Sequence, residues 1–352
     1  MQQIQAKYYF DRENRFVIEN YNWAKSFSNF LPGIAGKWGI PMWVYYVSKG
    51  QAVCSLGVHD KDHAIMEFQS FNKAFQTIFS QGFRTFVKCG SGDIYEPFRK
   101  VSSTSIKQQM LISSHELELC EVNEELGLEF NVLYFPLVNY PVSGLVRQLQ
   151  IKNLGNRPCS VEVIDGTPRI LPYGVKFEHV KVISHHIEAM MGVEFCSGIP
   201  LYRLKQTPSD TESVDEISGG NYYFSFDDSG KLLTKNMIVD PYIIFGESEN
   251  YDYPWMFAHN NIIQVLEKKQ ILENRTPCGM TAYKMDLSEN ESHTINSLIG
   301  YVSNERNSTD LIERTTNKGG LEDFREDNFH LIESIKNTTF TASSEPVFDQ
   351  YC

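Results

Sequence analysis

One segment in the middle of the 352-residue chain limits the possible folds more than any other. It reads Asp165-Gly-Thr-Pro-Arg-Ile-Leu-Pro-Tyr-Gly-Val175 and follows a strand-like stretch at residues 159–164. Pro168 and Pro172 each fix the backbone angle φ and lack an amide donor, so the segment can continue neither a helix nor a central strand. It therefore predicts a rigid, non-helical excursion from a sheet.

Apolar and polar residues alternate in many short stretches before residue 303, as they do in strands with one buried face. Residues 145–151 place Arg147 on the same face as Leu145 and Leu149. Residues 222–226 and 231–233 read as a hairpin through a polar turn. The aromatic content of 13% also favours strands. We therefore predict a mainly β fold, a large antiparallel β-sandwich. Another stretch with one apolar face contains Leu128, Phe130, Val132 and Tyr134.

The pattern changes to a helical one after residue 304. Residues 308–314 offer a capping residue and helix formers, and Gly319 and Gly320 interrupt them. We therefore divide the chain into a sandwich domain, residues 1–304, and a short helical linker, residues 305–352. The apolar stripe of the second helix needs a partner surface, so the linker must fold back on the sandwich, dimerise or fray. The stripe comprises Leu321, Phe324, Ile332 and Ile335.

Charge and composition exclude several classes of partner. A formal net charge of −12 argues against nucleic acid and anionic membranes, which require a basic patch. No apolar run is long enough to span a membrane, and the first residues lack the apolar core of a signal peptide. The seven cysteines are spread out without any Cys-x-x-Cys pair, which indicates reduced thiols. We therefore expect a cytoplasmic protein.

Two groups of residues could bind a metal ion or a sugar, but we predict a structural role for each. His59 and His63 would share one face of a strand with Lys61, away from the aspartates between them, so we predict a charged loop and no metal site. Aromatic residues near the start and in a later loop could bind sugar rings, but we expect them to pack in the core or at an interface. These are Trp38, Trp43, Tyr45 and Tyr46, and the loop at residues 251–255.

A set of short motifs occurs in order along the chain. It comprises Phe30-Leu-Pro-Gly-Ile-Ala-Gly36, Gly39-Ile-Pro-Met-Trp-Val44, Gln81-Gly-Phe-Arg-Thr85, Leu171-Pro-Tyr-Gly174 and Gly219-Gly-Asn-Tyr222. With the segment at 165–175, this set resembles the inverting disaccharide and β-glucan phosphorylases, the cellobiose-phosphorylase-like group of glycoside hydrolase families 94 and 161. The fit is better to the β-1,3-glucan-phosphorylase-like family. The resemblance implies a galactose-mutarotase-like super-sandwich and a helical linker, followed in the family by an (α/α)6 barrel with the catalytic Asp. We find no such barrel and assign no catalytic residue here.

The resemblance also implies a reaction and its partners. These glycosyltransferases cleave β-glucans or disaccharides with inorganic phosphate, giving a sugar 1-phosphate, and need no metal or other cofactor. The implied partners are a β-glucan oligosaccharide or disaccharide, a catalytic barrel in cis or in trans, and a second copy in a homodimer. Asp165, Arg169 and Tyr173 are the candidate sugar-binding residues, because Arg donates to hydroxyls and Tyr stacks on a sugar face. The alternative is a structural corner in which Arg169 pairs with Asp165.

Three other functions remain open. The chain could be a stand-alone carbohydrate-binding sandwich, or one subunit of a phosphorylase whose barrel is encoded separately. It could also be an autonomous enzyme, since related sandwiches occur in sugar mutarotases. That last function requires a histidine and a glutamate in one concave site, and the nearby candidates are His179, His185 and Glu178.

Overall fold

Strands that alternate buried and exposed residues form three antiparallel sheets in the computed structural model, which describes residues 4–90, 92–208, 217–248, 250–339 and 341–345. The largest sheet has ten strands. In spatial order they are β1 (Lys7–Phe10), β2 (Phe16–Glu19), β9 (Ile106–Ile112), β10 (Leu117–Asn123), β11 (Leu128–Pro136), β12 (Ser143–Asn153), β19 (Ser292–Val302), β16 (Gly220–Asp227), β15 (Ile199–Leu204) and β14 (Met191–Cys196).

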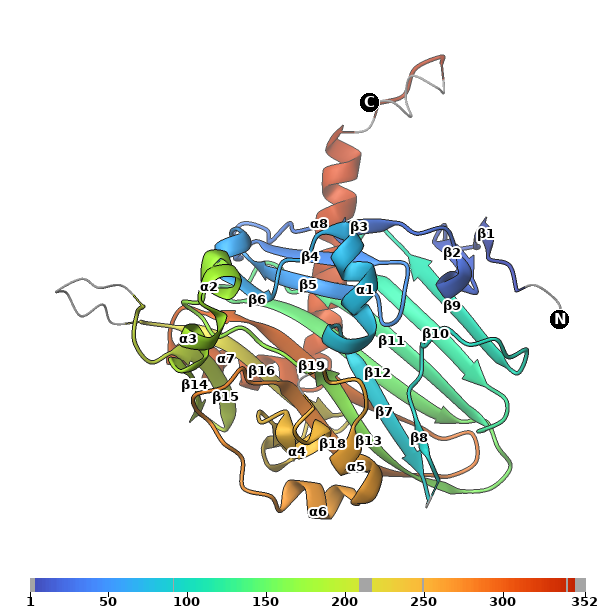
Figure 1. The fold of residues 1–352 in the computed structure, drawn as a ribbon. Helices are drawn as coiled ribbons and strands as arrows, with labels where there is room; N and C mark the ends of the chain where they lie inside the picture. The colour runs from blue at the N-terminus through green and yellow to red at the C-terminus, as the bar shows by residue number, and fades with distance from the viewer. Residues whose placement is uncertain (1–3, 91, 209–216, 249, 340, 346–352) are drawn as a thin grey trace.

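Two smaller sheets lie against one face of the large sheet (Figure 1). The five-stranded sheet runs in the order β17 (Met237–Ile238), β18 (Gly279–Leu287), β13 (Cys159–Thr167), β7 (Arg84–Cys89) and β8 (Ile94–Tyr95). The four-stranded sheet runs in the order β3 (Ser28–Leu31), β4 (Met42–Val47), β5 (Val53–Val58) and β6 (Ala64–Met66).

The main core lies between the large sheet and the two small ones. Leu128, Phe130, Val132 and Tyr134 of β11 all enter it, as their alternation predicts. Leu149 of the neighbouring strand β12 and Val163 of β13, which belongs to the facing five-stranded sheet, lie in the same core. The predicted antiparallel β-sandwich is therefore confirmed.

Short helices cover parts of the outer faces (Figure 1). One group packs on the smaller sheets and comprises α1 (Phe71–Gln81), α4 (Tyr242–Phe245), α5 (Trp255–His259) and α6 (Ile262–Leu266). Next to β6 lie α2 (Phe177–Val182) and α3 (Ser184–Glu188). Single 3-10 turns occur at Tyr21–Trp23, Lys61–His63 and Thr234–Asn236.

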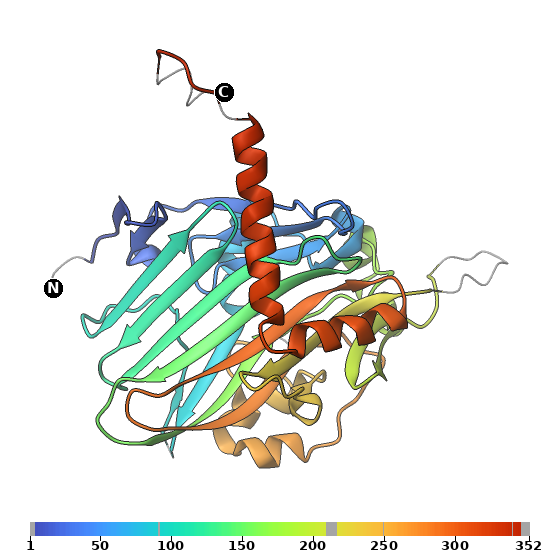
Figure 2. The same cartoon turned by 180° about the vertical axis from the view of Figure 1, so that it is seen from behind.

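The back of the large sheet is covered by α7 (Glu305–Thr316) and α8 (Gly320–Thr339) (Figure 2). This cover explains why all eight residues of β16 are buried: Tyr222, Phe224 and Phe226 face the helices, whereas Tyr223 faces the main core. By contrast, β10 alternates buried with half-buried residues, as a strand with one solvated face does.

The stripe on the last helix finds its partner within the chain. Leu321, Phe324 and Ile332 are buried, so of the three predicted outcomes α8 folds back on the sandwich. Arg325 fixes this position through two bonds to Glu116, at 2.7 and 3.0 Å. The helix then continues beyond the edge of the sheet (Figure 2).

Two local predictions can be refined. The predicted hairpin is present as a single antiparallel bridge, Phe226 to Leu232, with Leu233 donating its backbone amide to Ser225 at 2.9 Å, and Asp227 ties the turn through the backbone of Ser229 and Lys231. The stretch at 159–164 is part of a longer strand, β13, which continues to Thr167. No helix in the described part of the chain is long and apolar enough to cross a membrane.

Candidate functional site

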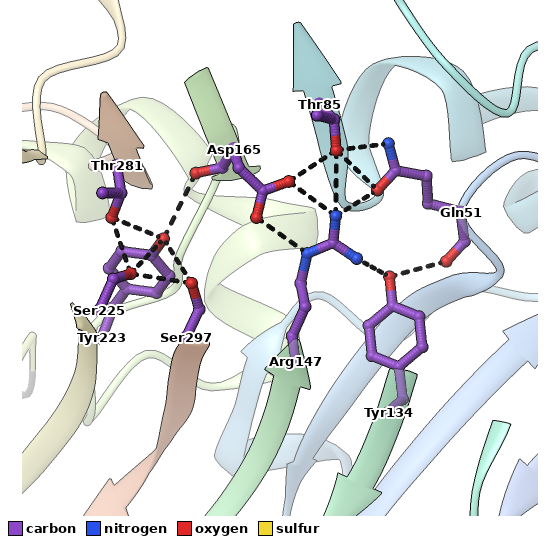
Figure 3. A network of polar contacts seen from close by, with 9 residues as sticks. All are labelled: Gln51, Thr85, Tyr134, Arg147, Asp165, Tyr223, Ser225, Thr281 and Ser297. Carbon is purple, nitrogen blue, oxygen red and sulfur yellow. Dashed lines mark hydrogen bonds and ion pairs between the residues drawn. The ribbon is translucent and has the colours of Figure 1, made fainter. Parts of the chain in front are cut away.

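A polar network crosses the middle of the sandwich and fixes the strand that leads into the candidate site (Figure 3). Arg147 of β12 forms two bonds with Asp165 of β13, from Nε at 3.1 Å and from Nη2 at 2.7 Å. Both side chains are fully buried. The other donors of Arg147 go to Tyr134 at 2.5 Å, Gln51 at 2.6 Å and Thr85 at 3.1 Å.

This network is electrostatically complete. Burial by itself would lower the pKa of Arg147, but the adjacent Asp165 carboxylate more than offsets that effect and the pKa is raised. Asp165 also accepts from the Thr85 hydroxyl at 2.6 Å, and its backbone carbonyl accepts from Tyr223 at 3.3 Å. A buried ion pair in which each guanidinium nitrogen has a hydrogen-bond partner is the arrangement that low-dielectric surroundings tolerate.

Asp165 is therefore not a surface residue. We expected it in a loop together with Arg169 and Tyr173, but it is a strand residue with no exposed area. Its carboxylate holds Arg147, so it does not pair with Arg169 as the structural alternative proposed. Its contribution is to hold the end of β13 in place.

The strand continues for two residues after this anchor and bends at Pro168. Gly166 has a φ of 142°, and a Cβ there would lie 2.1 Å from the carbonyl oxygen of Gly279 on β18, so a larger residue does not fit. Thr167 donates its hydroxyl to the backbone carbonyl of Arg169 at 3.1 Å, across the bend. A close strand contact and one hydroxyl thus fix the end of β13.

The following residues are tied by their backbones to several segments. Ile170 donates to Pro277, Leu171 to Ile65 and Tyr173 to Tyr202, all at 2.8–2.9 Å. Asn221 donates its side-chain amide to the carbonyl of Leu171 at 2.7 Å, although its own Oδ1 has no partner. The predicted rigid excursion from a sheet is confirmed for these residues.

Arg169 differs from its neighbours in this segment, because its side chain is not held by a hydrogen bond from the described residues. Its side chain is 27% exposed, and no hydrogen bond among the described residues uses its guanidinium. The nearest carboxylate oxygen is that of Glu67, 4.0 Å from Nη1. Arg169 lines a recess of about 10 Å³, room for a single water or hydroxyl, and it brings a guanidinium group with N–H donors to the wall of that recess.

The rest of the recess combines apolar side chains, those of Cys54, Met66 and Leu171, with three further polar ones. Gln69 and Gln81 line it, and no hydrogen bond in the described part of the chain uses their side-chain amides. Glu67 also lines it and is held on its other oxygen by Lys181 at 2.5 Å. Amides, one carboxylate and one guanidinium are the groups that bind sugar hydroxyls, because they offer both donors and acceptors. We call Glu67, Gln69, Gln81 and Arg169 the Arg169 recess.

Tyr173 lies in a separate aromatic cluster. Its ring is 4.7 Å from that of Tyr301 and 6.2 Å from that of His63. Burial and a hydrogen bond with Tyr173 raise the pKa of Tyr301. No hydrogen bond, ion pair or ring contact in the described residues joins the side chains of Asp165, Arg169 and Tyr173. The structure therefore separates the three predicted residues into a core anchor, a recess and an aromatic cluster.

The stretch from His59 to His63 is a charged turn beside this cluster. Asp60 accepts from the backbone of Asp62 and contacts His63 Nδ1, both at 2.8 Å. The two histidine rings lie 5.6 Å apart, edge to face. Across the described residues, no three His, Cys, Asp or Glu side chains are grouped as a metal ion would require.

The aromatic residues divide into buried and exposed ones. Tyr45 and Tyr46 are buried, as expected for packing, and so is Tyr251, in which burial raises the pKa to about 12. Three rings are exposed and so do not pack in the core: Trp38 at 67%, Trp255 at 54% and Tyr253 at 37%. Packing of these rings at an interface stays a prediction.

The residues proposed for mutarotase-like chemistry lie on short surface helices. Glu178 and His185 are exposed, and His179 Nδ1 accepts from the backbone of Lys176 at 3.2 Å, which caps α2. His179 thus has a local structural partner, and nothing in this geometry joins it to a catalytic glutamate.

Sequence reasoning missed Glu67, Gln69 and Lys181 as parts of the site. Gln81 stood inside one of the recognised motifs, but its role was not assigned. The position of Asp165 could have been found, because it shares the parity of Val161 and Val163 and so must point into the core. The contact between Arg169 and Glu67 joins residues 102 positions apart and had no comparable local pattern.

Comparison with known proteins gives a limited result. No protein-family model and no curated protein matches the sequence. A solved polysaccharide lyase is similar with a TM-score of 0.42 and 10% identity, over 78% of this chain and 34% of that chain. A galactose mutarotase-like protein from Clostridium acetobutylicum is similar with a TM-score of 0.39 and 9% identity, over 86% of this chain and 100% of that chain. This chain thus spans about a third of the lyase, and both similarities are low.

Proposed function

We propose that this chain is the sandwich part of a carbohydrate-active protein of the inverting glycoside phosphorylase type. In this proposal the Arg169 recess binds a hydroxyl of the sugar that leaves during phosphorolysis. The observation that carries it is the guanidinium of Arg169, which has no hydrogen-bond partner in the described residues although the loop that bears it is fixed on all sides. The sequence motifs supply the choice of reaction.

The chemistry assigns a limited task to this chain. A phosphate oxygen attacks the anomeric carbon, the glycosidic bond breaks, and a carboxylic acid protonates the departing oxygen, which gives an α-sugar 1-phosphate. In the proposal that acid belongs to a barrel domain in cis or in trans. The recess orients the leaving sugar, and correct orientation lowers the barrier because less freedom is lost on the way to the transition state.

The proposal extends to partners and location. The substrate is a β-glucan oligosaccharide or a disaccharide, with inorganic phosphate as the co-substrate. A homodimer would place the recess of one copy against the barrel of the other. Phosphate and sugar phosphates are intracellular, so the proposed location is the cytoplasm.

A binding experiment tests the role of the recess. Cello- and laminari-oligosaccharides are titrated into the wild type, Arg169→Ala, Arg169→Lys and the control Arg157→Ala by calorimetry. Arg157 is exposed, and its side chain has no partner among the described residues. We expect about tenfold or weaker binding for Arg169→Ala and a smaller loss for Arg169→Lys, because a hydrogen bond from a charged donor contributes about 1.5–3 kcal/mol. Equal affinity in all four proteins would contradict the role.

An activity assay tests the division of labour. The purified chain is incubated with cellobiose, laminaribiose or laminari-oligosaccharides and phosphate, and release of glucose 1-phosphate is followed. We expect no release from the chain alone. Phosphate-dependent release at a sustained rate would place the catalytic acid among these residues and overturn the proposal.

A stand-alone carbohydrate-binding sandwich is the second candidate. It is favoured by Tyr253 and Trp255, whose exposed rings lie 4.8 Å apart and could stack on sugar faces. Trp255→Ala distinguishes the two candidates. In a binding module it abolishes glucan affinity while Arg169→Ala leaves it intact, whereas the phosphorylase proposal expects the reverse.

A further inference from the structure

A pocket of about 410 Å³ with both polar and apolar walls lies on the back of the large sheet, in the corner between α7, α8 and the turn at 227–230. This is the face seen in Figure 2, whereas the Arg169 recess lies among the small sheets. Ligand pockets for small molecules typically measure roughly 300–1,000 Å³. The pocket is therefore large enough for a small organic ligand.

The floor of the pocket is set by strand register. Phe226 of β16 lies opposite Asn296 of β19, which lies opposite Gln148 of β12. Gln148 donates to the Oδ1 of Asn296 at 2.8 Å. Asn296 is only 6% exposed, and its Nδ2 has no hydrogen-bond partner in the described part of the chain, nor has the Oε1 of Gln148. The floor thus presents one amide donor and one amide acceptor side by side.

The walls are held by close backbone contacts. A Cβ on Gly230 would lie 2.2 Å from the carbonyl oxygen of Thr316, so the turn fits against the end of α7 only with glycine there. A Cβ on Gly320 would lie 2.0 Å from the carbonyl oxygen of Arg314, which fixes the start of α8. The pocket is therefore formed before any ligand binds.

The charges around the pocket select the kind of ligand. Lys318 has no ion-pair partner among the described residues, whereas Asp227, Asp228 and Glu322 bring negative charge to the same walls. The excess of carboxylates disfavours an anion. Amides, carboxylates and an ammonium together suit a ligand that has many hydroxyl groups and no charge.

We propose that this pocket binds a neutral saccharide of one or two rings. Asn296 donates to one hydroxyl, Gln148 accepts from another, and the side chains of Asp228 and Lys318 reach the rim of the ring. The site is separate from the Arg169 recess, so it does not depend on the proposed function.

Selective labelling with ¹⁵N-glycine tests the pocket on the intact chain. Gly230, Gly319 and Gly320 report on its rim, and Gly166 and Gly174 report on the loop that carries Arg169. Laminaribiose, cellobiose and glucose are titrated separately, with glucose 1-phosphate as the anionic comparator. We expect the rim signals to shift with at least one neutral sugar and at least about threefold more weakly with glucose 1-phosphate.

Matched variants locate the effect. Gln148→Ala combined with Asn296→Ala removes both amides, leaves no partner unpaired, and should weaken the response at the rim by at least about tenfold. Gln150→Ala changes the same face of the same strand outside the pocket and should leave the response intact. The inference is overturned if no neutral sugar shifts the rim signals, or if the double variant responds like the wild type. It is also overturned if glucose 1-phosphate binds as tightly as the neutral sugars. Failure of the Arg169 recess would instead appear as a missing response at Gly166 and Gly174 alone.

Discussion

Arg147 contacts β13 from the opposite sheet, whereas Arg169 follows the same strand by two residues, and their guanidinium groups have opposite surroundings. Arg147 is fully buried and bonds to Asp165, Tyr134, Gln51 and Thr85. Arg169 is partly exposed and has no hydrogen bond in the described residues, with Glu67 at 4.0 Å. Both residues are charged arginines. What distinguishes the arginine that holds the fold from the one that can bind a ligand is whether its N–H groups already donate to other residues of the chain.

The largest expected effect is on Arg147. Replacing Arg147 with Ala leaves Asp165 charged and buried without a cation, so we expect a loss of about 3–5 kcal/mol in the free energy of unfolding. Urea denaturation followed by far-UV circular dichroism measures this loss, with Arg157→Ala as the control. A loss below about 1 kcal/mol would remove the distinction between the two arginines.

A buried carboxylate without a cation sharpens the comparison. Glu121 is fully buried and accepts from Gln108 at 2.7 Å, from the backbone of Phe98 at 2.5 Å, and from Tyr95. Burial raises the pKa of Glu121, although these hydrogen bonds oppose the shift. Glu121→Ala leaves three donors unpaired, so we expect a loss of about 2–3 kcal/mol in the free energy of unfolding, measured by urea denaturation.

The pH dependence of Glu121 has a definite sign. Its pKa is higher in the folded than in the unfolded chain, so its contribution to stability is present at low pH and is lost as pH rises through the folded-state pKa. Glu121→Gln cannot ionise, and its amide nitrogen can face the Tyr95 hydroxyl. Urea unfolding above about pH 4 should therefore show the variant gaining stability relative to the wild type as pH rises. A constant difference would contradict the shift, and Glu289→Gln, at an exposed carboxylate, is the control.

Arg325 is intermediate between the two arginines. Its side chain is 35% exposed, but that of its partner Glu116 is only 7% exposed, so Arg325→Ala should cost about 1–2 kcal/mol, less than the change at Arg147. The effect should be local: amide hydrogen exchange should quicken in α8 near Asn328, which donates to the backbone of His115 at 2.8 Å. Exchange that quickens equally in β11 would show that the pair supports the whole sandwich.

The sequence predicted the elements of this fold better than their partners. Alternation placed Phe130 and Val132 on the core face, and it placed Arg147 among apolar residues, where the structure buries it. The position of the break between the helices also agrees, because Gly319 has a φ of 84°. These features are local, since they depend on side-chain parity and on backbone conformation.

The partners depend on tertiary packing. Asp165 follows Arg147 by 18 residues but lies in another sheet, and Glu67 precedes Arg169 by 102 residues. The segment at 165–175 was recognised as rigid, yet its anchoring residue and its exposed residue were taken as one binding group. Parity with Val161 and Val163 places Asp165 on the core face only if the strand continues past residue 164, and the predicted strand ended there, three residues before Thr167.

The smallest effect on stability is expected at Arg169, and it completes the comparison. Arg169→Ala removes no hydrogen bond among the described residues, so the free energy of unfolding should change by less than ~0.5 kcal/mol while sugar affinity falls. Urea denaturation and calorimetric titration of one preparation measure both quantities. Arg169 has a structural role if stability falls as much as with Arg147→Ala. If neither quantity changes, its free donors are not used for sugar binding, and the contrast with Arg147 would describe packing alone.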